Sequence, residues 1–86
     1  MYKVDLSSSA QKLYRKADRP LARKLARCFE QLEQEPRHHS SVKQLKGDLA
    51  GCYRFRVGDH RVIYRIDDEE QLVAVLKIAH RSEAYD

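Results

Sequence analysis

Residues 53–66 constrain the fold more than any other part of this 86-residue chain. Apolar and charged residues alternate there on both sides of Gly58-Asp59, and a period of two is typical of strands with one buried face. A Gly-X pair between two β-rich runs predicts a tight two-residue hairpin turn. If Gly58 and Asp59 form that turn, Val57 faces His60 and all other pairs of the hairpin are fixed.

This register sorts the hairpin side chains between two faces. The apolar face, which is expected to carry the helices, comprises Tyr53, Phe55, Val57, Val62, Tyr64 and Ile66. The other face comprises Arg54, Arg56, Arg61 and Arg65. Arg56 lies directly opposite Arg61, a like-charge pairing that costs up to about 1 kcal/mol.

No acid in either predicted strand lies on the arginine face, so an external anion is the simplest compensation for its charge. Guanidinium groups bind phosphate with two parallel hydrogen bonds, so four of them predict a site for a nucleic-acid backbone. The alternative is an ordinary solvated face, because antiparallel sheets commonly expose one polar side.

The N-terminal half predicts a short strand followed by two helices. Residues 2–6 alternate weakly, and the serines that follow them offer N-cap oxygens, with Ser8 and Gln11 fitting a capping box. An apolar stripe at helical spacing then covers residues 10–17. Asp18 is expected to cap a second amphipathic helix that ends before Pro36, which gives a helical hairpin.

The C-terminal half completes a β-α-α-β-β-β order. Residues 38–51 are mostly polar and predict a loop that tucks Leu45 and Leu49 under the core. Residues 71–79 predict a third consecutive strand in the interior of the sheet, because both of its faces are apolar. We therefore expect a single α+β domain over residues 1–86, with the helical hairpin packed on one face of a small antiparallel sheet.

The net charge and the two cysteines limit the partners, the compartment and the cofactors that we expect for this chain. The formal net charge is +4, and residues 37–65 hold seven Lys or Arg against two acids, which favours a polyanionic partner. No apolar run approaches the roughly 20 residues that span a bilayer, so no membrane partner is expected. Cys28 and Cys52, with no signal peptide before them, indicate free thiols in a reducing cytoplasm. With His38 and His39 they lack zinc-ligand spacing, so neither a metal nor a cofactor is expected.

The segment Leu45-Lys46-Gly47 together with residues 51–64 resembles the signature of the RelE/ParE toxin superfamily, and residues 78–85 are similar to its C-terminal motif. The His-Arg-…-Tyr tail favours the RelE-like nucleases. The resemblance implies a metal-independent endoribonuclease that enters the 30S A site of the ribosome and cleaves mRNA. The resemblance further implies that the 2′-hydroxyl attacks the adjacent phosphate, which leaves a 2′,3′-cyclic phosphate and a 5′-hydroxyl. A cognate antitoxin protein would wrap the toxin and silence it.

The resemblance also implies site residues. The basic positions of the hairpin and tail motifs, and the near-terminal aromatic, correspond to Arg54, Arg56, Arg61, Arg81 and Tyr85. Several members have lysine at the first two positions. Since an arginine does not lose its proton near neutral pH, a general-base role cannot be transferred to them.

The chemistry of RNA cleavage needs proton carriers besides cations. We expect His80 or Tyr85 to carry the protons, because imidazole titrates near neutrality and a phenol beside an arginine ionises more readily. The alternatives are a histidine packed at a strand end and a frayed terminal tyrosine. Lys43, Lys46 and Arg65 are expected to contact RNA phosphates.

Three other function classes remain open at this point, and one of them is an inactive or purely structural domain. A ParE-like inhibitor of DNA gyrase would share the fold and most of the hairpin. A non-catalytic nucleic-acid-binding module would act as a corepressor on operator DNA together with its antitoxin, with salt-dependent affinity and no cleavage.

Overall fold

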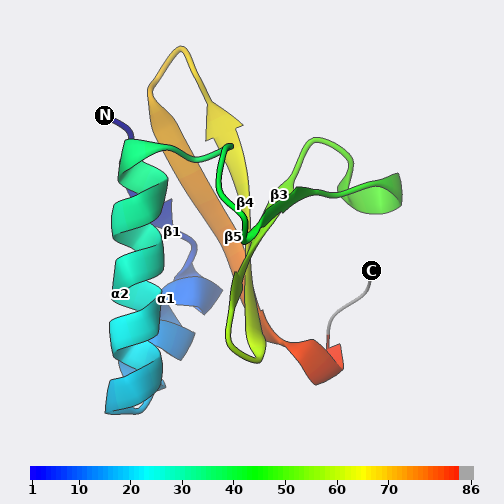
Figure 1. Cartoon of the computed structure of the whole chain (residues 1–86). Coiled ribbons are helices and arrows are strands. Elements are labelled where there is room, and N and C mark those ends of the chain that lie inside the picture. The colour runs from blue at the N-terminus through cyan, green and yellow to red at the C-terminus, as the bar shows by residue number, and fades with distance from the viewer. Residues whose placement is uncertain (84–86) are drawn as a thin grey trace.

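The computed structural model describes residues 1–83 and places two helices on one side of a five-stranded sheet (Figure 1). The helices are α1 (Ser8–Lys16) and α2 (Arg19–Gln34). The strands are β1 (Lys3–Leu6), β2 (Val42–Gln44), β3 (Tyr53–Val57), β4 (His60–Asp67) and β5 (Leu72–His80). Two short 3₁₀ helices, η1 (Gly47–Leu49) and η2 (Arg81–Glu83), follow β2 and β5. None of the helices described is long and apolar enough to cross a membrane.

The α+β class and the helical hairpin are confirmed. Asp18 caps α2 as predicted, accepting a 2.9 Å hydrogen bond from the N–H of Leu21. The N-cap of α1, however, is Ser7, whose Oγ accepts from the N–H of Ala10 at 3.2 Å. The predicted capping box at Ser8 is therefore wrong by one residue, because Ser7 is already extended and holds the helix start.

The sheet is mixed, with strand order β1-β5-β4-β3-β2, so the prediction of a wholly antiparallel sheet is wrong for the β1–β5 pair. β1 runs parallel to β5. Parallel neighbours need a long connection, and here both helices, β2 and the β3–β4 hairpin lie between the two strands in the chain. The other pairs are antiparallel, and β5 is an interior strand as predicted. The expected loop at 38–51 contains the edge strand β2, which pairs with β3 through Val42–Phe55 and Lys43–Arg54.

The core lies between the helices and the inner face of the sheet. Leu25 and Leu32 of α2 are fully buried there, as are Val62 and Tyr64 of β4. The hydroxyl of Tyr64 donates a 2.6 Å hydrogen bond to the carbonyl oxygen of Pro36, so this buried polar atom is satisfied. The prediction that Leu45 and Leu49 belong under the core is wrong: both are half-buried and line a hollow on the outer face.

Candidate active site

The hairpin register agrees with the prediction at every position, so the arginine face is real. Arg56 pairs with Arg61 and Arg54 with Ile63 across β3 and β4. Gly58 adopts a φ of 58°, a left-handed conformation that glycine accommodates without strain and that the tight turn requires. The predicted cations of β3 and β4 therefore project on the side of the sheet away from the helices.

The arginine hollow is a depression of about 280 Å³ on that outer face. It is lined by Lys43, Gln44, Leu45, Lys46, Leu49, Arg54, Arg56 and Arg61. Five of these side chains are cationic, and no Asp or Glu among the described residues joins the lining. Lys43 and Lys46, which were predicted to contact RNA phosphates, also line the hollow: Lys43 pairs with Arg54 across β2 and β3 and so shares its face, and Lys46 follows β2.

Ser41 holds the first arginine of the hollow in position. Its carbonyl oxygen accepts a 2.6 Å hydrogen bond from Nη1 of Arg54 and a 3.0 Å bond from the backbone N–H of Arg56. Arg54 is half-buried, whereas Arg56 is exposed. The hollow thus combines one oriented guanidinium with a second one that is open to a ligand.

The turn hollow, of about 240 Å³, continues this surface around the end of the hairpin. It is lined by Arg56, Gly58, Asp59, His60, Arg61 and Arg81. Arg81 is brought to the turn by its backbone N–H, which donates to the carbonyl oxygen of Asp59 at 2.6 Å. Its Nε lies 3.9 Å from the Asp59 carboxylate, and because both side chains are exposed this ion pair is weak. Arg56 and Arg61 line both hollows.

Of the two predicted proton carriers, only His80 is described by the structure, and it lines neither the arginine hollow nor the turn hollow. His80 pairs with His60 and lies on the side of β5 that carries the core residue Ile78, away from the arginine hollow. Its ring contacts that of His60 edge to face at 5.1 Å, and its Nδ1 lies 2.9 Å from Oγ of Ser82. Tyr85 lies outside the described residues. His60, which was not predicted from the sequence, pairs with Val57 and His80 on the helix side of the sheet, but at the end of the hairpin it lines the turn hollow with Arg56 and Arg61.

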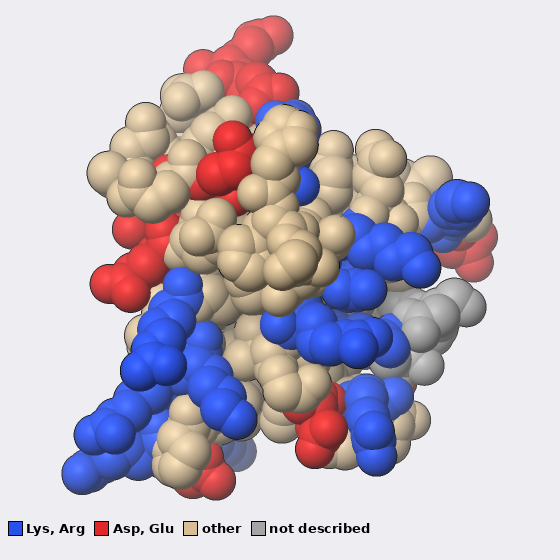
Figure 2. All heavy atoms as spheres, viewed as in Figure 1, with Lys and Arg blue, Asp and Glu red and all other residues tan. Residues whose placement is uncertain are grey.

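Arg65 shares the outer face but not the hollow. It lines a separate depression at the other end of the sheet, where the β4–β5 turn contributes Asp67, Asp68 and Glu69. Figure 2 shows the same separation: the cations gather over the lower part of the helices and over the β3 side, while the acids lie mainly at the opposite end. Arg65 therefore lies beside the carboxylates at this end of the sheet.

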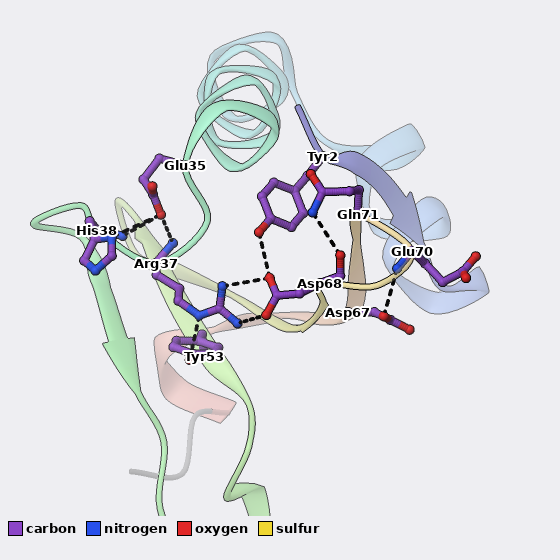
Figure 3. A network of polar contacts seen from close by, with 9 residues as sticks. All are labelled: Tyr2, Glu35, Arg37, His38, Tyr53, Asp67, Asp68, Glu70 and Gln71. Atoms are coloured by element: carbon purple, nitrogen blue, oxygen red, sulfur yellow. Dashed lines mark hydrogen bonds and ion pairs between the residues drawn. The ribbon is translucent and has the colours of Figure 1, made fainter.

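The sequence did not predict a polar network that connects Arg37, Asp68, Tyr2 and Tyr53. Arg37 donates from both terminal nitrogens to the Asp68 carboxylate at 3.0 and 2.9 Å, and Tyr2 donates to the same carboxylate at 2.7 Å (Figure 3). Nε of Arg37 lies 3.3 Å from the hydroxyl of Tyr53. The network joins the segment after α2 to the β4–β5 turn, and Ser41 follows that segment. These hydrogen bonds hold the pKa of Asp68 below its usual range.

Asp68→Asn is expected to lower the free energy of unfolding at pH 7, because the ion pair with Arg37 is lost. A carboxylate with a lowered folded pKa stabilises the fold above its unfolded pKa, about 3.9 for aspartate. That contribution is lost as the pH falls through the lowered folded value. The difference between the two proteins in urea denaturation should therefore shrink as the pH falls below about 4, and vanish once the pH lies below the lowered folded pKa. A difference that stays constant over this range would contradict the assignment; Asp67→Asn is the control within the same turn.

The cysteines and histidines form no metal centre in residues 1–83: no group of three or more His, Cys, Asp or Glu side chains there could hold an ion. Cys28 and Cys52 are free and buried. Burial raises the pKa of the Cys28 thiol to about 12, so it is protonated and unreactive at neutral pH.

Comparison of the sequence with known proteins shows which family this chain belongs to. The family model described as the ParE toxin of type II toxin–antitoxin systems (parDE) matches residues 4–85. The chain is 35% identical to toxin RelG of Mycobacterium tuberculosis over 85 residues, which is 98% of this chain and 95% of RelG. It is 45% identical to toxin RelE of the same organism over 47 residues, 55% of this chain and 48% of that toxin.

Solved structures agree. The RelBE2 toxin–antitoxin complex of M. tuberculosis matches with a TM-score of 0.79 and 31% identity over 93% of this chain and 98% of that chain. The RelE–RelB complex of Pyrococcus horikoshii matches with a TM-score of 0.82 and 28% identity over 96% and 98%. The chain belongs to the RelE/ParE superfamily of toxins of type II toxin–antitoxin systems, as its hairpin and tail predicted.

Proposed function

We propose that this toxin is a ribosome-dependent endoribonuclease that cleaves mRNA in the A site and acts in the cytoplasm. The observation that carries the proposal is the arginine hollow, in which five cationic side chains line one depression on the outer face of the sheet. Such a hollow suits a phosphodiester whose charge grows during reaction, because fixed donors aimed at developing charge lower the barrier most. The 35% identity to toxin RelG over nearly the whole chain supports the assignment.

In the proposed reaction the 2′-hydroxyl of one nucleotide attacks the adjacent phosphorus. The bond from O2′ to phosphorus forms and the bond from phosphorus to O5′ breaks, which leaves a 2′,3′-cyclic phosphate and a 5′-hydroxyl. One proton leaves O2′ and one reaches O5′. Arg54, Arg56, Arg61 and Arg81 neutralise the charge of the phosphorane, and this supply of fixed positive charge makes a metal ion unnecessary. Lys43 and Lys46 hold neighbouring phosphates.

Proton transfer is assigned to an imidazole or a phenol. His80 and Tyr85 are the candidates from the sequence, and His60 is the candidate from the geometry, since it lines the turn hollow beside Arg56 and Arg61. A positioned acid or base contributes about 10²–10⁴-fold in rate.

We expect His60→Gln to slow cleavage on programmed ribosomes by about 10²-fold or more, and His80→Gln to slow it much less. The two residues are matched in type, and they are neighbours across the β4–β5 pair. Tyr85→Phe completes the set and tests the phenol. The rate constant is measured in single turnover at pH 6, 7 and 8. If all three variants cleave at the wild-type rate, proton transfer belongs to none of these side chains.

The partner proposed for this toxin is a cognate antitoxin. The matched chains of M. tuberculosis and P. horikoshii come from toxin–antitoxin complexes, and a basic toxin surface suits an acidic inhibitory segment. The complex is proposed to bind operator DNA as well. Toxicity on expression, rescued by the neighbouring open reading frame, tests the partnership.

A second candidate function is inhibition of DNA gyrase, because the family model that matches residues 4–85 is that of the ParE toxin. One experiment separates the two. After induction, primer extension maps new 5′ ends on translated transcripts, while gyrase-dependent DNA breaks are counted in the same cells. Breaks in DNA without mRNA cleavage would overturn the endonuclease proposal. Naked RNA is expected to be cleaved slowly, because the ribosome positions the reacting atoms.

A further inference from the structure

A third hollow, of about 360 Å³, lies on the other side of β3, between that strand and α2. We call it the helix-side hollow. It is lined by Lys24, Arg27, Cys28, Gln31, His39, Phe55, Arg56, Val57 and Gly58. The proposed cleavage chemistry uses none of these residues except Arg56. The hollow is open, and no Asp or Glu within residues 1–83 lines it.

One wall of the helix-side hollow is formed by the imidazole ring of His39. The ring of His39 stacks on that of Phe55, with centroids 4.9 Å apart and planes inclined by 29°. Nδ1 of His39 accepts a 3.0 Å hydrogen bond from the N–H of Ser41, so the neutral ring carries its proton on Nε2. Phe55 is buried whereas His39 is exposed. The pair therefore presents a fixed, solvent-accessible aromatic surface with a hydrogen-bond donor on its edge.

The opposite wall is a polar stripe of α2. Lys24, Arg27 and Gln31 are spaced by three and four residues, so they share one face of the helix. Nζ of Lys24 lies 3.6 Å from the point that a β-carbon on Gly58 would occupy, which places its ammonium group beside the β3–β4 turn. The hollow thus has two cations from α2, one amide and an aromatic wall, and Arg56 also lines it from β3.

We propose that the helix-side hollow binds one nucleotide of single-stranded RNA. The base stacks on His39, Gln31 contacts its edge, and Lys24 and Arg27 hold its phosphate. Aromatic platforms beside cations are the usual means of binding unpaired strands, because every base offers a face for stacking. A duplex is disfavoured, since its bases are already stacked on each other.

The helix-side hollow adjoins the arginine hollow, and this position determines which nucleotide of the RNA it would bind. Arg56 lines both hollows, so an RNA strand that leaves the arginine hollow around the edge of β3, beyond the Val42–Phe55 pair, reaches the helix-side hollow next. This nucleotide flanks the scissile phosphate and lies outside the reacting pair. The inference rests on the proposed function in taking RNA as the bound polymer, but binding is measurable without cleavage.

The experiment measures fluorescence anisotropy of labelled RNA hexamers carrying 2′-O-methyl groups, which bind but are not cleaved because the attacking hydroxyl is blocked. His39→Ala is expected to weaken binding about tenfold, the effect of removing one stacking platform. His39→Tyr, which keeps a ring, should restore most of the affinity. Thermal denaturation of each variant verifies that the fold is retained, and His39→Tyr keeps the test valid if His39→Ala is unstable.

Charge is tested with matched double variants. Lys24→Ala with Arg27→Ala removes two cations of the hollow, and Arg15→Ala with Lys16→Ala removes two exposed cations of α1 that do not line it. The first pair should weaken hexamer binding about tenfold and the second by less than threefold. Equal losses would overturn the proposal in favour of unspecific attraction.

Two further outcomes would also overturn it: equally tight binding of an RNA duplex, or a loss of affinity for the acidic antitoxin with RNA binding unchanged. Failure of the proposed function looks different. Hexamer binding that depends on His39, in a protein that cleaves no mRNA on ribosomes, would refute the nuclease and leave the nucleotide site in place.

Discussion

Arg56→Ala is expected to lower the rate of mRNA cleavage by about 10²–10³-fold, the effect of removing one donor that is fixed before the reaction begins. Arg56 is exposed, lines both the arginine hollow and the turn hollow, and lies opposite Arg61. Its substitution also relieves a like-charge pair, so the fold should be as stable or slightly more stable. A loss of activity therefore cannot be attributed to unfolding.

The matched control is Arg65→Ala on the same face of the sheet. Arg65 is also exposed but lies beside the acids of the β4–β5 turn. Its loss removes the same charge, and cleavage should fall less than tenfold if general attraction is its contribution. Arg56→Lys should recover part of the rate, because the charge remains while the two parallel hydrogen bonds are lost. Equal loss in Arg56→Ala and Arg65→Ala would mean that net charge, and not the hollow, drives the reaction.

The arginine face could be predicted from the sequence because one local feature determines it. Gly58-Asp59 is a two-residue turn, and once that turn is placed, side-chain alternation assigns every residue of β3 and β4 to a face. The helical hairpin was predictable for a similar reason, since an N-cap at Asp18 and an apolar stripe are local signals.

The face of His80 could not be predicted, because it depends on a bulge. The pairing of β4 with β5 shifts between Ile63 and Tyr64, which leaves Leu76 as an extra residue in β5. Core positions on β5 therefore pass from Val75 to Ile78, a step of three residues. Regular alternation from Val75 would have placed His80 on the arginine face; the bulge reverses it.

β2 and the Arg37 network escaped prediction because their determinants are distant. The three residues of β2 have no strand pattern of their own, and they are extended because the edge of β3 offers backbone partners. Arg37 and Asp68 are 31 residues apart, and no local pattern links them. Both features follow only from the packed fold.

Leu25→Ala is expected to have the largest effect on stability, with a loss of about 2–5 kcal/mol in the free energy of unfolding. Leu25 is fully buried and belongs to the cluster that packs α2 on the sheet. A domain of this size has a total stability of roughly 5–10 kcal/mol, so the substitution removes a large share of it. Each kcal/mol corresponds to about 4–8 °C in Tm for such a domain.

Leu76→Ala is the matched control, because Leu76 lies at the bulge of β5 and is 39% exposed. Its loss should change the free energy by about 0.5 kcal/mol or less. Leu25→Val, which leaves a smaller cavity, should fall between the two and keeps the comparison valid if the alanine variant does not fold. Urea denaturation monitored by circular dichroism measures all three. Similar urea midpoints for the Leu25 and Leu76 variants would show that the packing of Leu25 does not hold α2 on the sheet. The helix-side hollow, which α2 lines, would then lack a fixed wall.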